Sequence, residues 1–316
     1  MKNVDHYDWG VCIFSSREDC VTLKFTLMAC VIACSGKRSI IDILINGNNE
    51  LAKNILQELN APEFLNNNLL TIRIWTIDEP DKANGFNQYF HKIWPNSNVV
   101  FFVDGYVQPW ADAFINIENE LMSSNKALAA TGVPTSGRSA DFLRREMISS
   151  GGIHGNLFAL KKSTIIRIRE INFNLPLGVY RTDPIIGAAL AFNLEPKNND
   201  WDIKSRVLVV SKASWNLPQK SKSIINEAVS FFKRKIRQER GELENIAIKE
   251  QFTVFKKSPG DLPVNAEVLI SGWVNSNKKD SLFLFLKHPL ALYAYKYTIQ
   301  MFPGMNLEAK LVKCFN

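Results

Sequence analysis

Short apolar runs alternate with segments of helical spacing between residues 9 and 105. The apolar runs predict strands at 9–14, 39–46, 69–77 and 98–105. Helical spacing predicts one helix between the first two strands and others at 50–60 and 81–94. Strands that alternate with helices over short connections form a mostly parallel sheet with helices on both faces. The sequence therefore predicts an α/β fold.

The pattern continues less regularly from residue 107 to residue 215. We expect a helix entered through Pro109 and a strand at 127–135, followed by a polar and mobile stretch at 136–147. A glycine-rich turn then leads into a strand and a helix within 151–168. The remaining elements are a helix at 180–192 and a last strand at 206–215.

The character of the chain changes after Pro218. Residues 222–248 have the spacing of a long basic amphipathic helix, and 281–302 is an apolar, aromatic segment interrupted by Pro289. We therefore expect two domains: 1–218, an α/β domain, and 219–316, a basic, aromatic-rich, helical extension.

The net charge of +7 is spread unevenly. Residues 1–218 hold 22 Lys or Arg and 22 Asp or Glu, whereas residues 219–316 hold 16 and 9. A localised basic region favours an anionic partner, such as a membrane surface, a phosphate-bearing lipid or nucleic acid. The alternative is that these helices are only solvated or pack back on the sheet. No nucleic-acid-binding module is recognisable, so we expect no nucleic acid partner.

Cysteine usage and hydropathy bear on location. The five cysteines form no C-x-x-C pair, which indicates thiols in a reducing cytosol. The most apolar run, 25–34, is shorter than the roughly 18 residues of a membrane helix and predicts a buried helix. No secretory signal pattern is visible. We expect a cytoplasmic protein, with a peripheral position on the inner face of the membrane as an alternative.

Polar residues follow each of the first four predicted strands. In parallel sheets the ligands bind outside the carboxyl ends of the strands, so these residues are expected to meet at one rim. A nucleotide-sized pocket is the expected result. The four groups are 15–18, 46–49, 78–82 and 104–106.

The order and content of these segments resemble a family 2 glycosyltransferase with the nucleotide-sugar-binding GT-A fold, over roughly residues 8–215. The resemblance rests on "FSSRED" (14–19), "KANGFN" (82–87), the strand end at Asp104, "SGGIHGNLFALKK" (150–162) and "RTDPIIGAAL" (181–190). It implies a catalytic base at Asp183. The donor-binding residues that it implies are Ser15, Ser16, Glu18 (or Asp19), Asn46 (with Asn48), Lys82, Asn87, Asp104, Gly152 and His154.

The reaction that the resemblance implies is an inverting transfer from a nucleotide sugar, with a UDP-sugar favoured, to a glycan or lipid-linked hydroxyl. Surface polysaccharide or glycolipid synthesis is the implied setting. A carboxylate takes the acceptor proton, and a divalent cation stabilises the departing diphosphate. The family's Asp-x-Asp clamp is represented by Asp104 alone, because Tyr106 replaces the second acid. Mn²⁺ or Mg²⁺ on Asp104, with Tyr106 as a doubtful ligand, is therefore expected. Lys82, Arg138, Arg144 and Arg145 are candidates to replace part of that charge.

Each of these residues also has an ordinary structural interpretation. Asp183 before Pro184 suits a helix N-cap, and Asp104-Gly105 suits a turn. Lys82 could be an ordinary solvated lysine of a helix, and His154 could be an ordinary loop histidine. Among other enzyme classes, a nucleotidyltransferase or dehydrogenase is expected to carry glycines after the first strand, which "SSRED" lacks. A non-catalytic relative that binds a sugar nucleotide or glycan remains the alternative function.

Overall fold

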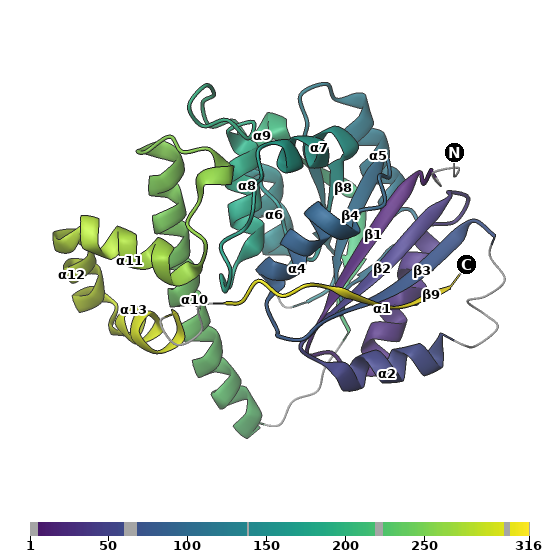
Figure 1. Cartoon of the computed structure of the whole chain (residues 1–316), viewed down its shortest axis with the longest axis horizontal. Coiled ribbons are helices and arrows are strands. Elements are labelled where there is room, and N and C mark those ends of the chain that lie inside the picture. The colour runs from purple at the N-terminus through teal and green to yellow at the C-terminus, as the bar shows by residue number, and fades with distance from the viewer. Residues whose placement is uncertain (1–5, 60–67, 138, 219–223, 300–303, 316) are drawn as a thin grey trace.

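The computed structural model describes residues 6–59, 68–137, 139–218, 224–299 and 304–315 (Figure 1). A single mixed sheet has the strand order β5-β8-β6-β7-β4-β1-β2-β3-β9. The strands are β1 (Trp9–Ser15), β2 (Ser39–Asn46), β3 (Leu70–Ile77), β4 (Val99–Asp104), β5 (Gln108–Pro109), β6 (Ala129–Pro134), β7 (Leu157–Lys161), β8 (Val207–Asn216) and β9 (Lys310–Phe315).

Helices connect and cover these strands. They are α1 (Cys20–Ala33), α2 (Asn49–Glu58), α4 (Lys82–Gln88), which continues as the π-helical turn η1 (Tyr89–Ile93), α5 (Ala113–Ser123), α6 (Ala140–Ser150), α7 (Lys162–Glu170), α8 (Thr182–Ala191), α9 (Ile203–Arg206) and α10 (Ile224–Thr253). Beyond the 3₁₀ turn η2 (Pro259–Asp261) follow α11 (Ala266–Ser276), α12 (Lys278–Lys287), α13 (Pro289–Ala294) and the π-helical turn η3 (Tyr295–Ile299).

The central strands β4, β1, β2 and β3 are parallel, so the predicted α/β fold with a mostly parallel sheet is confirmed. Antiparallel strands join this group on both sides. β7 pairs with β4 in register Val103↔Leu157, and β9 pairs with β3 at the opposite edge. The central parallel group means that the carboxyl ends of β1 and β4 share one rim, where β7 begins.

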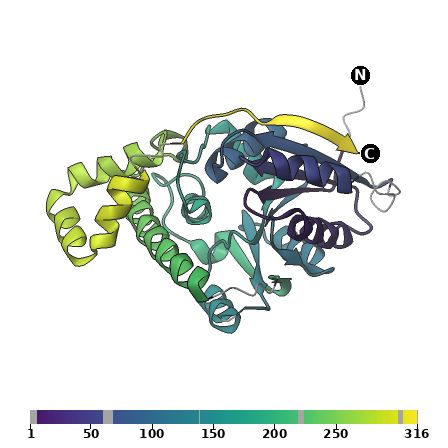
Figure 2. The same cartoon turned by 90° about the horizontal axis from the view of Figure 1, so that it is seen from below.

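Two hydrophobic layers hold the sheet. Helices α1, α2 and α5 pack on one face, whereas α4, α7 and α8 pack on the other and α10 and α11 add to them (Figures 1 and 2). Neighbouring residues of β4 serve opposite layers, as strand geometry requires. Phe101 stacks on Phe114 at 4.2 Å on one face, and Phe102 stacks on Phe158 at 4.8 Å on the other. β4 thus contributes to both hydrophobic layers, with Phe102 in one and Phe101 and Val103 in the other.

The last third of the chain is largely helical, as predicted. α10 packs against α8, α11 and α13, and α11–α13 lie at the end of the molecule remote from β1–β3 (Figure 1). The chain then runs back to place β9 on the sheet edge beyond β3 (Figure 2). The proposed domain boundary after residue 218 remains a prediction. No helix among the described residues is long and apolar enough to cross a membrane.

Three local predictions were wrong. The stretch 136–147, expected to be polar and mobile with no element of its own, holds most of a helix, because residues 140–150 form α6, whose Ala140 and Met147 are buried. Segment 206–215 is not the last strand, because β9 follows about a hundred residues later. Run 25–34 is only half buried. Leu27 and Cys30 face the sheet, but Phe25 and Ile32 are 54% and 57% exposed.

Candidate functional site

Asp104 ends β4 beside the end of β1, at the rim that the strand pattern predicted. β1 and β4 are paired at Phe14↔Asp104, and the Gly105 amide donates to the Phe14 carbonyl at 2.7 Å. A Cβ on Gly105 would lie 2.9 Å from Ser15 Cβ, so only glycine permits this approach. The Val107 amide donates to the Asp104 carbonyl at 2.9 Å. The turn interpretation is therefore correct for the backbone, and it leaves the Asp104 carboxylate directed at other groups.

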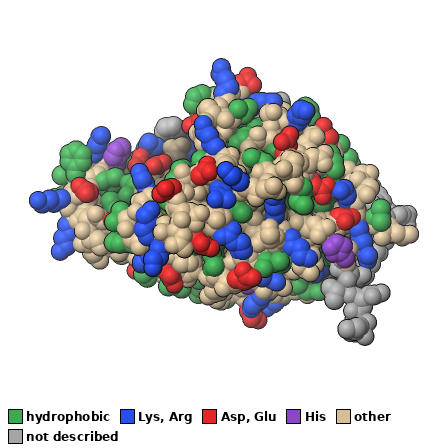
Figure 3. Space-filling model, turned by 90° about the horizontal axis from the view of Figure 1, so that it is seen from above, with side chains coloured by type: hydrophobic (Ala, Val, Ile, Leu, Met, Phe, Trp, Pro, Cys, Tyr) green, Lys and Arg blue, Asp and Glu red, His purple; other side chains and the backbone are tan. Residues whose placement is uncertain are grey.

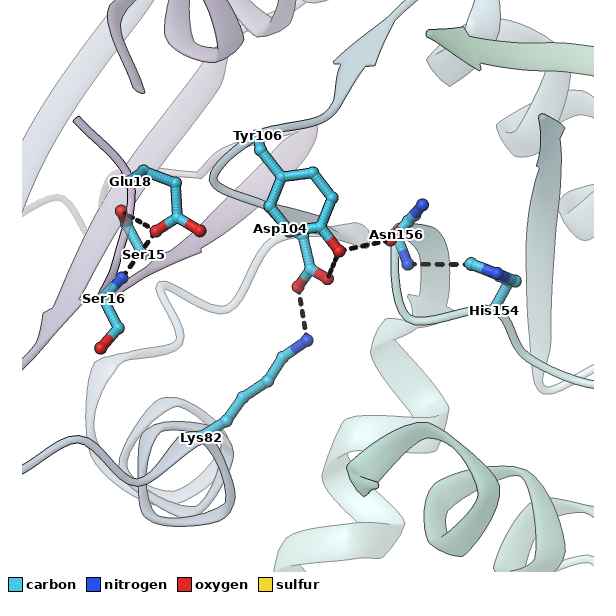
Figure 4. Close-up of polar contacts among 8 residues, drawn as sticks. All are labelled: Ser15, Ser16, Glu18, Lys82, Asp104, Tyr106, His154 and Asn156. Atoms are coloured by element: carbon cyan, nitrogen blue, oxygen red, sulfur yellow. Dashed lines mark hydrogen bonds and ion pairs between the residues drawn. The ribbon is translucent and has the colours of Figure 1, made fainter. Parts of the chain in front are cut away.

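Lys82 forms an ion pair with Asp104 (Figure 4). Asp81 caps α4 by accepting from the Ala83 amide at 2.9 Å, which fixes Lys82 as the first residue of the helix. The Lys82 side chain is 31% exposed. Burial acts to lower the pKa of Lys82, but the carboxylates of Asp104 and Asp183 outweigh it and raise that pKa. Lys82 is therefore a cation held at the rim and not merely a solvated surface lysine.

The Tyr106 hydroxyl lies between two oxygens. It is 3.2 Å from Asp104 Oδ2 and 3.1 Å from Asn156 Oδ1 (Figure 4). Burial raises the pKa of Tyr106, and the Asp104 carboxylate raises it further. Tyr106 is thus a neutral hydrogen-bond donor that orients Asp104.

The glycine-rich turn presents His154 to the same site. Gly151 and Gly152 have φ of 78° and 106°, which favour glycine, and the turn leads to β7. His154 Nδ1 accepts from the Asn156 amide at 3.2 Å, so Nε2 carries the proton when the ring is neutral. Burial lowers the pKa of His154, and Asp183 and Asp104 only partly oppose this shift. Its ring lies 5.3 Å from that of Trp215.

Asp183 lies in the first turn of α8 and does not cap it. The capping residue is Arg181, and no side chain caps the helix, so the N-cap interpretation of Asp183 was wrong. Within the described part of the chain the Asp183 carboxylate has no hydrogen bond or ion pair. Gly155 lies against it, since a Cβ there would be 3.3 Å from Asp183 Cγ. Asp183 is therefore an uncommitted carboxylate beside Lys82 and His154.

A buried carboxylate on α10 fixes the entry to α8. Glu244 accepts from the Tyr180 amide at 2.8 Å and from the Arg181 amide at 3.1 Å. It also pairs with Arg240 at 3.0 Å. Burial raises the pKa of Glu244, and Arg240 reduces the rise. The basic helix therefore positions the segment that carries Asp183.

The loop after β1 is ordered by Glu18. Its Oε2 accepts from Ser15 Oγ at 2.7 Å and from the Ser16 amide at 2.8 Å (Figure 4). Asp19 instead caps α1 through the Thr22 amide at 2.7 Å. Of the two acids that the sequence left open, Glu18 is thus the one on the rim.

The three predicted asparagines differ in their surroundings. Asn46 is buried at the end of β2, and its Oδ1 has no hydrogen-bond partner among the described residues. Asn48 caps α2 and donates to the Ser16 carbonyl at 2.9 Å. Asn87 exchanges two hydrogen bonds with the Leu175 backbone. Both ends of its amide are therefore occupied in packing, away from the Asp104 group.

The proposed substitute cations other than Lys82 do not join this cluster. Arg144 donates to the Ser211 carbonyl at 2.9 Å, and Arg145 donates to the Asp141 carbonyl at 3.3 Å. Arg138 lies outside the described residues.

The side chains at Asp104 do not form a clamp for a divalent cation. Its two carboxylate oxygens face Lys82 and the Tyr106 hydroxyl. A protonated phenol is a poor ligand for Mg²⁺ or Mn²⁺, which prefer carboxylate and other hard oxygens. Within the described ranges no three His, Cys, Asp or Glu residues come together as a metal site. The residues at this site therefore do not fit the divalent ion that the resemblance implies.

Sequence reasoning did not find two residues of this candidate site, Asn156 and Glu244. Asn156 links Tyr106 to His154, and its carbonyl accepts from the Asp104 amide at 3.3 Å. The resemblance drew Gly152 and His154 from the segment before β7, but it gave no role to Asn156 in the same segment. Because β7 runs antiparallel to β4, the residue before β7 reaches the same rim.

No model of a known protein family matches the chain, and no curated protein matches it. Among solved structures, the mannosyltransferase PcManGT from Pyrobaculum calidifontis, in complex with GDP-Man and Mn²⁺, matches with a TM-score of 0.52 at 14% identity, over 94% of this chain and 81% of that chain.

Two further solved structures match with lower scores. S. aureus TarS with UDP-GlcNAc has a TM-score of 0.46 at 10% identity, over 93% of this chain and 81% of that chain. Glucosyl-3-phosphoglycerate synthase from Mycobacterium tuberculosis, in complex with phosphoglyceric acid, has a TM-score of 0.46 at 9% identity. The match covers 78% of this chain and 80% of that chain. The similarity to the mannosyltransferase shows a GT-A-type fold, and the fold implied by the sequence resemblance is confirmed.

Proposed function

We propose that the chain is an inverting glycosyltransferase that moves a sugar from a nucleoside diphosphate sugar to a hydroxyl of a glycan or lipid-linked acceptor. One observation carries the proposal. Asp183, with no hydrogen-bond partner among the described residues, stands beside the Lys82–Asp104 pair at the rim where α/β sheets bind their ligands. The fold shared with a mannosyltransferase bound to GDP-Man supports a nucleotide-sugar donor.

The proposed roles follow from charge and position. Asp183 accepts the proton of the acceptor hydroxyl as that oxygen attacks the anomeric carbon. Lys82 faces the departing diphosphate, because a cation is needed where negative charge develops. Asp104 and Tyr106 hold Lys82 and orient the donor. Glu18, with Ser15 and Ser16, lines the nucleotide side.

Asn46 supplies an unused buried acceptor oxygen to the proposed donor site. Gly152 allows the turn that presents His154. We leave Asn87 out of this site, since the Leu175 backbone occupies its amide. A UDP-sugar remains the favoured donor, and surface polysaccharide or glycolipid synthesis remains the proposed setting.

The decisive experiment compares Asp183→Asn with Asp141→Asn. Both acids lie in the first turn of a helix, but Asp141 is an exposed residue of α6. Donors are first selected by thermal shift with UDP-, GDP- and dTDP-sugars. We expect Asp183→Asn to lower nucleoside diphosphate release by about 10²–10⁴-fold while donor binding persists. Full turnover in Asp183→Asn would exclude it as the base. Donor binding without turnover in the wild type would favour the non-catalytic relative.

Metal dependence is tested separately. We expect wild-type turnover to persist in chelator, because Lys82 supplies the charge. Tyr106→Asp restores the second acid and is expected to add Mn²⁺ binding measurable by calorimetry. Strict Mn²⁺ dependence of the wild type would refute the assignment to Lys82. Unchanged Mn²⁺ affinity in the variant would show that position 106 does not face a metal position.

A further inference from the structure

α12 exposes an apolar stripe on the side that faces away from the protein. Leu282, Phe283 and Leu286 are 60%, 68% and 73% exposed. Spacings of three and four residues place them on one face of the helix. Ser281 is buried on the opposite face, where Leu284 and Phe285 pack against the core. A helix that is apolar on both faces is normally covered on both.

Lysines frame this stripe. Lys279 lies in line with it, one turn before Phe283, and Lys278 and Lys287 flank it on either side. All three are exposed, and within the described residues none forms an ion pair. The following segment adds exposed Lys296 between Tyr293 and Tyr297, which are 46% and 51% exposed. Asp280 is the one acid between residues 278 and 297.

The exposed apolar side chains of α12 and the lysines around them indicate the kind of partner that this surface binds. Figure 3 shows hydrophobic and basic side chains next to one another at the end of the molecule that α12 and α13 form. Aliphatic and phenyl groups that point outward do not suit nucleic acid, which offers phosphates and base edges. A second copy would bring its own lysines against these, and like charges repel. An anionic lipid surface satisfies both features, since acyl chains accept the stripe and headgroups accept the ammonium groups.

We propose that the outer face of α12, with the adjoining α13–η3 segment, docks on an anionic lipid bilayer. Leu282, Phe283 and Leu286 enter the boundary between headgroups and acyl chains, and the lysines contact the headgroups. α13 packs on α10, and α10 packs on α8, the helix of Asp183. The docked face therefore connects through two helices to the candidate site. The docking itself does not depend on the proposed transfer reaction.

Vesicle co-sedimentation of the full chain tests the proposal. Phosphatidylcholine vesicles with and without phosphatidylglycerol are compared at low and high NaCl. We expect binding only with phosphatidylglycerol and loss of binding in high salt. Lys279→Ala is expected to lower the partition coefficient about fivefold, and Phe283→Ser about tenfold or more. Matched controls, Lys53→Ala on α2 and Phe142→Ser on α6, alter side chains that are also exposed and should leave binding unchanged.

Several outcomes would overturn the docking surface. They are no binding to anionic vesicles, equal losses in the control variants, or equal binding to neutral vesicles. Size-exclusion chromatography gives a further one: a dimer that Leu286→Ser converts to a monomer would make this face a self-association surface. If Phe283→Ser lowers the midpoint of unfolding, the test rests on Lys279→Ala. Lys279 is exposed and has no ion pair among the described residues, so its replacement should not destabilise the fold.

Discussion

Gly155→Ala would displace Asp183 without removing any functional group. The new Cβ would lie 3.3 Å from Asp183 Cγ and 3.5 Å from its Oδ1. Carbon atoms prefer separations of about 3.5–4.0 Å, so the carboxylate must move by a few tenths of an ångström. Gly155 does not have positive φ, so alanine meets no backbone strain there.

The size of the effect follows from the displacement. An ångström of misplacement can cost about 10²-fold in rate, so a shift of a few tenths is expected to lower turnover by about threefold to tenfold. The free energy of unfolding should change little. Replacing glycine lowers the conformational entropy of the unfolded chain, which stabilises the fold by about 0.4–1 kcal/mol and offsets the cost of the tight contact. Donor affinity should stay the same, since Asp183 acts on the acceptor.

The assay measures nucleoside diphosphate release and thermal unfolding together. Gly272→Ala is the matched control, because a Cβ there would meet nothing within 4 Å. It lies inside α11 and should raise stability by roughly 0.5–1 kcal/mol with no change in turnover. Full turnover in Gly155→Ala would refute the geometry proposed for Asp183. A loss of turnover accompanied by unfolding would mean that the contact serves packing instead.

Three other perturbations follow from the same site. Lys82→Met should weaken donor binding by about 10–100-fold, as expected for the loss of a charged hydrogen bond worth about 1.5–3 kcal/mol. Unchanged donor affinity by calorimetry would contradict the role proposed for Lys82. Glu244→Ala should lower the free energy of unfolding, measured with denaturant, by about 3–5 kcal/mol, because the Arg240 guanidinium and two backbone amides lose their acceptor. A loss below ~1 kcal/mol would show that water takes the place of the Glu244 carboxylate. The pKa of His154 lies below its ordinary 6.5, so the unfolded chain binds a proton that the folded chain excludes. His154 therefore contributes stability above pH 6.5, and this contribution is lost as the pH falls through 6.5 toward the pKa of the folded state. NMR titration of the folded protein should give a midpoint for His154 below 6.5. A midpoint at or above 6.5 would contradict the effect of burial.

The order of the early elements could be predicted because local forces decide it. Fully apolar strands and polar caps recur at short range, and Asp81 and Asp19 cap their helices through amides two or three residues away. The position of Asp104 at the rim beside the end of β1 followed from the same pattern, since the carboxyl ends of parallel strands share an edge. Candidate residues Lys82, Asp104, Tyr106 and Glu18 were all visible for this reason.

Other features depended on long-range pairing. Asn156 became part of the site because β7 runs antiparallel to β4, and the direction of a strand is not written in its own residues. The unused carboxylate of Asp183 contrasts with the cap that its sequence suggests, because the backbone enters α8 under the control of Glu244 on α10. β9 reaches its place only because the preceding helices return the chain to β3.

The sequence by itself thus determined the order of strands and helices between residues 9 and 105 and the polar residues that follow those strands, because short-range sterics and hydrogen bonds govern both. The tertiary structure decided which of these polar groups meet and which are consumed in packing, as Asn87 is by the Leu175 backbone. It also decided which apolar side chains stay outside, as on α12. Both outcomes depend on how distant elements pack, and hydrophobicity along the chain does not encode that geometry.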